Sequence, residues 1–445
     1  MTPKSPPTPQ VHLETFGCQM NESDSELVRS MLKQEGFVFT EDRERADVVL
    51  VNTCAIRENA HNKIYAHLSE LKVIKKRRPL VVGVLGCMAQ NLKRELAQKE
   101  PLVDILAGPD AYRQLPRLLA TALKAQEQGF SKKGFALDLS EYETYEGIMP
   151  DRESGVNAWI TVMRGCDNFC AFCVIPYTRG RERSRDPEGV LLEARDAAAR
   201  GFRQITLLGQ NVNSYRADEW DFARLIRAVA DTPNIDRVRF TSPHPKDFPP
   251  ALIEAIATHP KVCKHIHLPL QAGSDRILDL MGRTYTGAEY LALVEQIRGT
   301  IPGVVLTTDI ICGFCTESDR DFQDTCRMVE RIRFNSAYIF KYSERKNTIA
   351  ARKYLDDVPD YVKGARVSKL VDIQRNITQK LNREYVGRDL EVLIERDATR
   401  SSSQGMGKTD GNITVVWDKG TNPFKPGALI TKHIVDATPA TLYGE

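Results

Sequence analysis

Short apolar runs alternate with amphipathic segments over the first quarter of the chain. The apolar runs are Val11–Cys18, Ala46–Cys54 and Leu80–Cys87. Segments with apolar residues three and four positions apart, such as Asp24–Glu35 and Glu58–Lys75, lie between them and predict helices. Because strand and helix alternate, we expect a parallel sheet with helices on its faces over residues 10–126. The preceding residues 1–9 are rich in proline and polar side chains, which is typical of a disordered tail.

A second set of strand-like runs begins after residue 156 and is spaced by helical patterns such as Pro187–Arg200, Phe222–Ala230 and Gly287–Arg298. Six β-α units in a row predict a partial (β/α)6 barrel over residues 157–382, with its chemistry at the carboxyl ends of the strands. The stretch 127–156 contains glycines and an acidic run, and it favours a solvated connector. The expected strands are Trp159–Gly165, Gln204–Gly209, Asp236–Thr241, His265–Leu270, Leu306–Cys312 and Ser336–Tyr342.

The last segment, residues 383–445, changes character. Strand-like pieces such as "DLEVLIER" and "NITVVWDKG" are separated by Gly, Ser, Asn and Pro, which predicts a small antiparallel β-barrel. The glycine-rich "QGMGKTDG" within it lacks the first glycine of a phosphate-binding loop, and a strand follows it where that loop needs a helix. It therefore fits a hairpin loop or a basic loop that contacts RNA backbone, and the pattern does not separate the two.

Composition narrows the class of protein. Of 445 residues, 42% are hydrophobic and 27% are charged, as in soluble globular proteins. No signal peptide or apolar span is visible, so we expect a cytoplasmic protein without membrane contact. Thiols stay reduced in the cytosol, and the ten cysteines therefore favour metal binding or catalysis over disulfides. The net charge of +3 is too mild to indicate nucleic-acid binding by itself.

Each of the first three predicted strands ends in a cysteine. Cys18, Cys54 and Cys87 should converge, because the carboxyl ends of parallel strands meet at one edge of the sheet. The alternative is ordinary packing of three small apolar residues. The repeated position favours a shared site.

Three further cysteines, Cys166, Cys170 and Cys173, follow the first predicted barrel strand with C-x3-C-x2-C spacing. A structural zinc site needs a fourth ligand, which would have to come from a distant residue. A 4Fe-4S cluster held by three thiolates instead leaves one iron open to an outside ligand. With Phe172 before the last cysteine, this motif resembles that of the radical S-adenosylmethionine (SAM) superfamily, in which the open iron binds SAM and the reduced cluster cleaves it to a 5′-deoxyadenosyl radical.

Longer motifs narrow the resemblance to the radical SAM methylthiotransferases, and among them to the tRNA enzymes that act on N6-dimethylallyladenosine beside the anticodon. The resemblance implies an N-terminal Rossmann-like domain, a radical SAM barrel and a C-terminal TRAM barrel that binds RNA. It also implies that Cys18, Cys54 and Cys87 hold a second, auxiliary 4Fe-4S cluster that supplies sulfur, and that one SAM methylates this sulfur while another generates the radical. The motifs are "TFGCQMNESDSE", "NTCAIRENA", "GCMAQ", "MRGCDNFCAFCVIPYTRGRERSR", "LLGQNVNSY", "RFTSPHP" and "HLPLQAGSDRILDLMGR".

Partners follow from the same resemblance. The expected partners are tRNA carrying N6-dimethylallyladenosine, a reductant such as flavodoxin or ferredoxin, and a sulfur source, and we expect a monomer. Polar residues after the barrel strands are candidates for holding SAM beside Phe172, and arginines behind the cysteine loop are candidates for contacting tRNA phosphate or the SAM carboxylate. The SAM candidates are Gln210, Asn211, Ser242, Gln271 and Ser274, and the RNA candidates are Arg179, Arg181, Arg183 and Lys408, with Arg185 completing the alternating arginines.

Several alternatives stay open at this stage. The arginine run also fits a solvated charged face, and polarity after strands is ordinary for loops. Cys312 and Cys315 form a C-x2-C pair that fits a third metal site or simple packing. A methylthiotransferase acting on threonylcarbamoyl-adenosine or on a ribosomal-protein aspartate shares the same chemistry. A non-enzymatic iron–sulfur carrier or RNA-binding protein is disfavoured, because a carrier normally closes its cluster with four cysteines.

Overall fold

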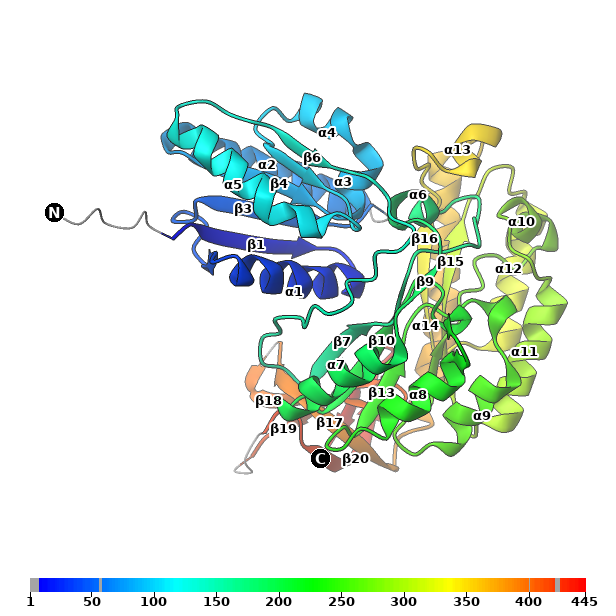
Figure 1. Cartoon of the computed structure of the whole chain (residues 1–445). Coiled ribbons are helices and arrows are strands. Elements are labelled where there is room, and N and C mark those ends of the chain that lie inside the picture. The colour runs from blue at the N-terminus through cyan, green and yellow to red at the C-terminus, as the bar shows by residue number, and fades with distance from the viewer. Residues whose placement is uncertain (1–7, 56–57, 400, 421–424) are drawn as a thin grey trace.

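The structure is a computed structural model that describes residues 8–55, 58–399, 401–420 and 425–445. Residues 1–7 of the expected tail lie outside this range. Figure 1 shows three parts: an N-terminal α/β part in blue and cyan, a central part in green and yellow, and a C-terminal part in orange and red beneath the central strands. Within the described residues, no helix has the length and apolar character needed to cross a bilayer.

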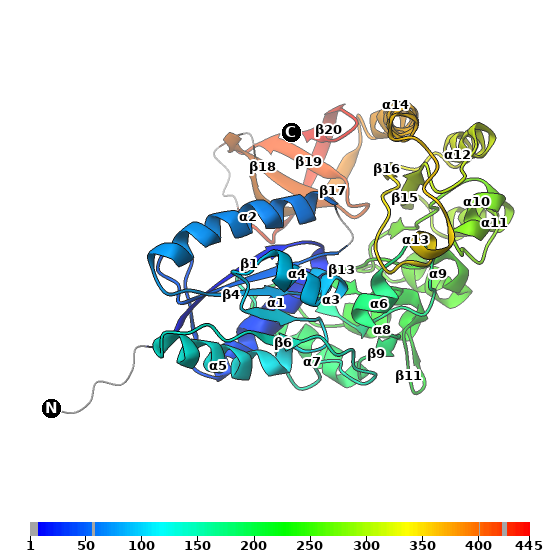
Figure 2. The ribbon, with the colours of Figure 1, turned by 90° about the horizontal axis from the view of Figure 1, so that it is seen from above.

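The N-terminal part is a parallel sheet between two layers of helices, as the sequence pattern predicts. Helices α1 (Gln19–Gln34) and α5 (Leu115–Glu127) bury one face, while α2 (Glu58–Arg77), α3 (Cys87–Leu92) and α4 (Arg94–Lys99) bury the other (Figure 2). Alternate β3 residues point into the two cores, because successive side chains of a strand face opposite sides. The strand order is β2 (Val38–Phe39), β1 (Gln10–Phe16), β3 (Val48–Thr53), β4 (Val81–Leu85), β5 (Ile105–Ala107) and β6 (Gly134–Ala136).

The segment 127–156 differs from the solvated connector that its composition favours. Its residues Gly134–Ala136 form β6, which pairs in parallel with β5 at the edge of the sheet. Tyr145, within the acidic run, is buried and its hydroxyl donates to the Pro109 carbonyl at 2.8 Å. The connector prediction is wrong for these residues: Gly134–Ala136 complete the open edge of the sheet, and the Tyr145 ring stacks on Tyr112 at 5.8 Å.

The central part is the expected partial barrel. Its strands β7 (Asn157–Thr161), β10 (Gln204–Leu208) and β13 (Arg237–Phe240) form one parallel sheet, and β14 (His265–His267), β15 (Val305–Cys312) and β16 (Ser336–Lys341) form another. A parallel bridge between Val238 and Val262 joins the two sheets. The main helices between and after the strands are α7 (Pro187–Ala199), α8 (Phe222–Ala230), α9 (Pro250–Thr258), α11 (Gly287–Thr300), α12 (Asp319–Ile332) and α14 (Asp360–Arg383).

Shorter elements complete the central part. Two of them, β8 (Met163–Arg164) and β9 (Arg183–Ser184), pair with each other on either side of the cysteine loop. The others are α6 (Ile175–Arg179), α10 (Asp275–Leu280), α13 (Ile349–Lys353), β11 (Arg216–Ala217) and β12 (Trp220–Asp221).

The strands of the central part separate an apolar outer face from a polar inner one. Ile205 and Val238 belong to a core shared with the surrounding helices. Residues one position away, such as Thr206 and Arg239, lie on the other face, because side chains alternate along a strand. At this end of the strands the polar side chains bond to other protein groups, Thr206 to Asn157 and Arg239 to the C-terminal barrel.

The C-terminal part is a closed barrel of strands in the order β17 (Asp389–Ala398), β18 (Ser401–Thr409), β19 (Thr414–Asp418), β21 (Leu442–Gly444) and β20 (Leu429–Ala437). Most pairs are antiparallel, and the pair β19–β21 is parallel. The turn between β18 and β19 docks under the central strands, where Arg239 donates to the Thr409 carbonyl at 2.7 Å and Arg237 to the Lys408 carbonyl at 2.6 Å. The glycine-rich segment is thus a strand and its turn.

Candidate active site

The three strand-end cysteines of the N-terminal part lie at one edge of its sheet. Their strands β1, β3 and β4 are neighbours, and the Cys54 amide donates to the Phe16 carbonyl at 3.1 Å. A hydrogen bond from the Cys54 thiol lowers the pKa of Cys18 to about 6, and the Arg179 guanidinium contributes in the same direction. Cys87 is buried at the start of α3 and accepts from Arg179 Nε at 3.2 Å. The expected convergence of these strand ends is confirmed.

The second set of cysteines lies on the loop between β8 and α6. Gly165 opens this loop with a positive φ of 80°, and a Cβ there would lie 1.9 Å from the Arg181 carbonyl oxygen. Arg283 Nη1 donates to Cys170 Sγ at 3.3 Å, and Asn168 Nδ2 lies 3.6 Å from Cys166 Sγ. Burial raises the pKa of Cys166 to about 11. A guanidinium donor thus lies beside Cys170 and an amide donor beside Cys166, and such donors favour a thiolate.

The two cysteine sets are close neighbours. Ala55, Cys87 and Val174 form one small buried cluster, in which Val174 directly follows Cys173. Helix α3 packs against α6, and α1 packs against β7, where Ser23 and Thr161 share a hydrogen bond of 2.9 Å. One layer of side chains therefore separates a cysteine of one set from the loop that carries the other.

Buried arginine donors beside the cysteines suit a negatively charged iron–sulfur cluster. Across the described residues, no three His, Cys, Asp or Glu side chains come close enough to hold one ion. A four-iron cluster binds each thiolate to a different iron, so its cysteines lie farther apart than the ligands of one zinc ion. In the described part of the chain, Arg179 Nη1 and Arg164 Nη1 are buried donors without a hydrogen-bond partner. Such donors suit the sulfur atoms of a cluster that carries negative charge.

The arginine run corrects one expectation from the sequence. Arg179 and Arg183 are buried and bond to carboxylates, Arg179 to Asp24 at 2.7 Å and Arg183 to Asp110 at 2.8 Å. Arg185 is likewise buried against Glu193 at 2.6 Å. These side chains are unavailable to RNA phosphate, because their charges are already neutralised inside the protein. Arg181 is the exception: its side chain is 65% exposed, with Asp167 at 2.9 Å.

Sequence reasoning did not single out Asp24, Arg283 or His244. Asp24 is fully buried on α1 and receives both Arg164 and Arg179. His244 is buried against Tyr285, and burial together with Arg283 lowers its pKa to about 2. A polar residue in a helix or loop carries no local signal of burial, so only the tertiary contacts identify these three.

The residues expected to hold SAM fall into two groups. Asn211 Oδ1 and Gln271 Oε1 are buried acceptors that have no hydrogen-bond partner among the described residues, which suits contact with a polar ligand. Gln271 and Ser242 have positive φ values of 71° and 60°, a conformation that costs energy and is concentrated at functional sites. Gln210 Oε1 instead accepts from the Gly165 amide at 2.6 Å and supports the cysteine loop.

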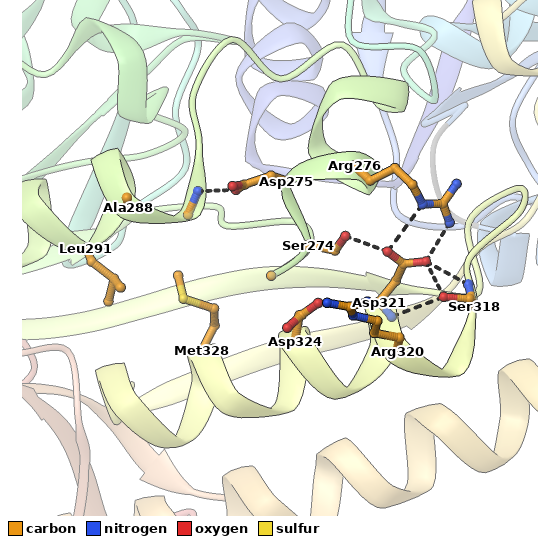
Figure 3. Close-up of a pocket in the computed structure, with 12 residues that line it drawn as sticks. Ser274, Asp275, Arg276, Ala288, Leu291, Ser318, Arg320, Asp321, Asp324 and Met328 are labelled. Atoms are coloured by element: carbon orange, nitrogen blue, oxygen red, sulfur yellow. Dashed lines mark hydrogen bonds and ion pairs between the residues drawn. The ribbon is translucent and has the colours of Figure 1, made fainter.

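Two further candidates are occupied by protein contacts. The Ser274 hydroxyl donates to Asp321 at 2.6 Å, within a network that includes Arg276 and Ser318 (Figure 3). This network lines a pocket of about 550 Å³ between α10, α11 and α12, and none of the lining residues is a cysteine. Phe172 is partly buried against the central core. The assignment of these two side chains to SAM stays a prediction.

The remaining thiols pack in the interior. Cys312 lies in the apolar layer between β15, α12 and α14, and Cys315 lies in the central core. Burial raises the pKa of both thiols, as it does for Cys166, so the pKa does not decide between packing and ligation; the two thiols instead belong to different apolar clusters. Packing therefore explains this pair better than a third metal site.

The inner face of the barrel carries aromatic rings as well as polar groups. Ile339 of β16 packs with the layer under α14, so Tyr338 and Phe340 lie on the opposite face, where both are exposed. Tyr338 contacts His267 of β14 edge to face at 5.9 Å, and His267 pairs with Asp309 at 3.2 Å. Lys408 of the C-terminal barrel is half-buried, and its Nζ donates to Thr414 at 2.8 Å. This face offers stacking surfaces and charge to a nucleic-acid base.

Family models match three segments of the chain. They are the uncharacterized protein family UPF0004 at residues 10–108, the radical SAM superfamily at 160–329 and the TRAM domain at 383–445. The chain is 46% identical over 436 residues to the tRNA-2-methylthio-N(6)-dimethylallyladenosine synthase of Pelodictyon phaeoclathratiforme, covering 97% of each chain. It is 45% identical to the protein of the same name from Porphyromonas gingivalis, covering 98% of this chain and 94% of the relative.

Solved structures support the fold at lower identity. The radical SAM methyltransferase TsrM from Kitasatospora setae, with cobalamin and a [4Fe-4S] cluster bound, matches with a TM-score of 0.57 and 13% identity over 77% of each chain. The cobalamin-dependent SAM radical enzyme OxsB matches with a TM-score of 0.53 and 13% identity, covering 84% of this chain and 56% of that one. At this identity the likeness concerns the arrangement of the α/β parts alone.

Proposed function

This chain belongs to the family of tRNA-2-methylthio-N6-dimethylallyladenosine synthases, which are radical SAM enzymes, and we propose that it installs a methylthio group on C2 of N6-dimethylallyladenosine beside the anticodon of tRNA. The observation that carries the proposal is the 46% identity across 97% of the chain. Two neighbouring three-cysteine sets support it, since the reaction needs a radical source and a sulfur source. The domain boundaries that accompany the proposal are residues 157 and 383, since residues 134–136 form β6 of the N-terminal sheet.

As a radical SAM enzyme the chain uses a 4Fe-4S cluster and SAM, and the auxiliary cluster is part of the proposal. Cys166, Cys170 and Cys173 would hold the first cluster. The auxiliary set, Cys18, Cys54 and Cys87, would hold the second. When bound, these groups supply one-electron cleavage of SAM and the sulfur for transfer. This chemistry suits the substrate, because no side-chain base removes a proton from an aromatic carbon at neutral pH.

The chain's own residues bind and orient the reactants. We assign the buried acceptors of Asn211 and Gln271, with Ser242, to SAM. The exposed Tyr338 and Phe340 would stack on a splayed base of the anticodon loop.

The RNA backbone and the remaining partners need other contacts. Of the four cations expected to contact RNA phosphate, Arg179 and Arg183 form buried ion pairs. We therefore assign the phosphate contacts to the other two, Arg181 and Lys408. A reductant such as flavodoxin or ferredoxin and a sulfur source complete the reaction, and we propose that the chain works as a monomer in the cytoplasm.

Two cysteine variants test the division of labour between the sets. Cys173→Ala should abolish anaerobic SAM cleavage, because it removes a ligand of the cluster that binds SAM. Cys87→Ala should retain SAM cleavage and lose methylthio transfer, because it affects only the auxiliary set. Formation of the methylthio product by the Cys87 variant would contradict the assignment of sulfur supply.

Mass spectrometry of tRNA nucleosides from a strain lacking this protein tests the substrate. Loss of the 2-methylthio group with accumulation of N6-dimethylallyladenosine is the expected result. Loss of methylthio from threonylcarbamoyl-adenosine, or from a ribosomal-protein aspartate, would instead establish the alternative substrate. Unchanged nucleosides and ribosomal protein would contradict a methylthiotransferase altogether.

A further inference from the structure

Arg179 connects the two cysteine sets, because it ends the helix after the radical SAM cysteines and donates a hydrogen bond to Cys87 of the auxiliary set. It is the last residue of α6, six positions after Cys173, and its side chain is 2% exposed. Its Nε donates to Cys87 Sγ at 3.2 Å, and its Nη2 donates to Asp24 Oδ2 at 2.7 Å. Within the described residues its Nη1 is buried without a hydrogen-bond partner. One guanidinium thus reaches from the loop of the radical SAM cysteines to a cysteine of the auxiliary set.

Asp24 fixes the orientation of this guanidinium. Its carboxylate, 0% exposed, receives Arg179 on one oxygen and Arg164 on the other, at 2.7 and 2.8 Å. Two guanidinium groups share this carboxylate, so one positive charge is left beside the auxiliary cysteines. A 4Fe-4S cluster held by three thiolates carries net negative charge, which would balance the remaining positive charge of the two guanidinium groups.

We propose that Arg179 is a positioning residue for the auxiliary cluster: held by Asp24, it orients Cys87 and stabilises the reduced cluster by a hydrogen bond to the thiolate sulfur. The inference rests on the proposed function for the existence of that cluster. It adds a specific role for an arginine of this chain, and it gives a reason for the packing of α6, which follows the radical SAM cysteines, against α3.

The expected effect is on the reduction potential. Hydrogen bonds to cluster sulfurs and nearby positive charge favour the more negative, reduced state, so they raise the potential. Removing the hydrogen bond that Arg179 donates to Cys87 should therefore lower the reduction potential of the auxiliary cluster. The donor to Cys170, Arg283, lies on another element, so the radical SAM cluster should keep its own potential.

The test uses full-length protein in which Cys166, Cys170 and Cys173 are replaced by alanine, so that only the auxiliary cluster can form. The variant is Arg179→Lys, since lysine keeps the charge opposite Asp24 but cannot donate to Asp24 and Cys87 in the planar geometry of arginine. The matched control is Arg183→Lys, a neighbouring arginine that is also buried, pairs with Asp110 and, among the described residues, bonds no cysteine. Each is titrated anaerobically with titanium(III) citrate, which gives one electron to the cluster, and the reduced cluster is read by electron paramagnetic resonance.

Arg179→Lys should make the cluster at least tenfold harder to reduce, which corresponds to about 59 mV for one electron, while Arg183→Lys leaves it unchanged. An intact cluster with an unchanged potential in Arg179→Lys overturns the inference. If Arg179→Lys folds but takes up no iron, the rate at which iodoacetamide alkylates Cys87 in the iron-free protein decides. A severalfold change from the parent, in either direction, supports the contact of Arg179 with Cys87, and an equal rate overturns it. A parent that holds no auxiliary cluster overturns the proposed function instead, so the two failures are distinguishable.

Discussion

The carboxylate of Asp24 and the guanidinium of Arg164 meet at 2.8 Å, although 140 positions separate them in the chain. Asp24 lies on α1 of the N-terminal part and Arg164 on β8 of the barrel. Both are excluded from solvent, and the ring of Tyr145 lies 4.6 Å from the Arg164 guanidinium. The two parts are therefore joined by a buried ionic contact immediately beside the cysteines, and the stability of the joint depends on it.

Replacing Asp24 should destabilise the whole chain. Asp24→Asn leaves Arg164 and Arg179 buried without their anion, and the loss of one partner of a buried pair costs about 3–5 kcal/mol of unfolding free energy. Urea denaturation under anaerobic conditions measures this. Glu153→Gln is the control, because the pair of Glu153 with Arg29 is exposed on the Glu153 side, at 71%, and such pairs contribute at most about 1 kcal/mol. Equal effects of the two variants would contradict the structural role of Asp24.

Gly165→Ala should disrupt the cysteine loop. The positive φ of 80° disfavours alanine, and the added methyl group would collide with backbone at Arg181. Gly129→Ala is a matched control, since Gly129 has a φ of 82° and open space around it, so only the conformational cost of about 1–2 kcal/mol applies. We expect the iron content of the Gly165 variant to fall by about half, with the Gly129 variant unchanged. Full iron content in both would show that the loop tolerates the collision.

Tyr338→Ala should weaken tRNA binding without affecting SAM cleavage in the absence of tRNA. Stacking of a base on an aromatic ring contributes about 1–3 kcal/mol, so the dissociation constant should rise roughly 5- to 150-fold. Tyr361→Ala is the comparison, because Tyr361 is also exposed, at 79%, but lies at the start of α14 and outside the barrel strands. Fluorescence anisotropy with an anticodon stem-loop gives both constants. If both variants bind like the parent, the inner face is not the stacking surface.

The free energy of unfolding should depend on pH through the ionisation of the Glu14 carboxyl group. Burial alone would raise the pKa of Glu14, but hydrogen bonds from His12 and His67 lower it from 4.5 to about 2. The bond to Glu14 in turn raises the pKa of His12 above 6.5. Because its pKa is lowered, Glu14 stabilises the fold above pH 4.5, and this stabilisation is lost as the pH falls towards 2. Because its pKa is raised, His12 stabilises the fold below pH 6.5, and this stabilisation is lost as the pH rises further.

The difference in unfolding free energy between the parent and Glu14→Gln should therefore be largest between pH 4.5 and 6.5. It should shrink on both sides of that window. Urea denaturation at a series of pH values measures it. A difference that stays constant from pH 3 to 8 would show that the three side chains do not form this charged cluster.

The arrangement of strands and the places of the cysteines could be predicted from the chain itself. Strand and helix leave local periodicities of two and about 3.6 residues, and Cys18, Cys54 and Cys87 each follow a strand that the pattern identifies. Once the strands are parallel and adjacent, their carboxyl ends meet, so the convergence needs no long-range information.

The partners of the charged residues were decided by the tertiary structure alone. Arg179 and Arg183 alternate in a polar run that fits a solvated surface equally well, and the acidic segment around Tyr145 fits a connector. Arg179 and Arg183 are buried because α1 and the segment 140–146 lie against them and accept their hydrogen bonds. Sequence patterns report which side chains prefer water, whereas burial of a charge depends on a counter-charge that another element brings from far along the chain, as Asp24 does here.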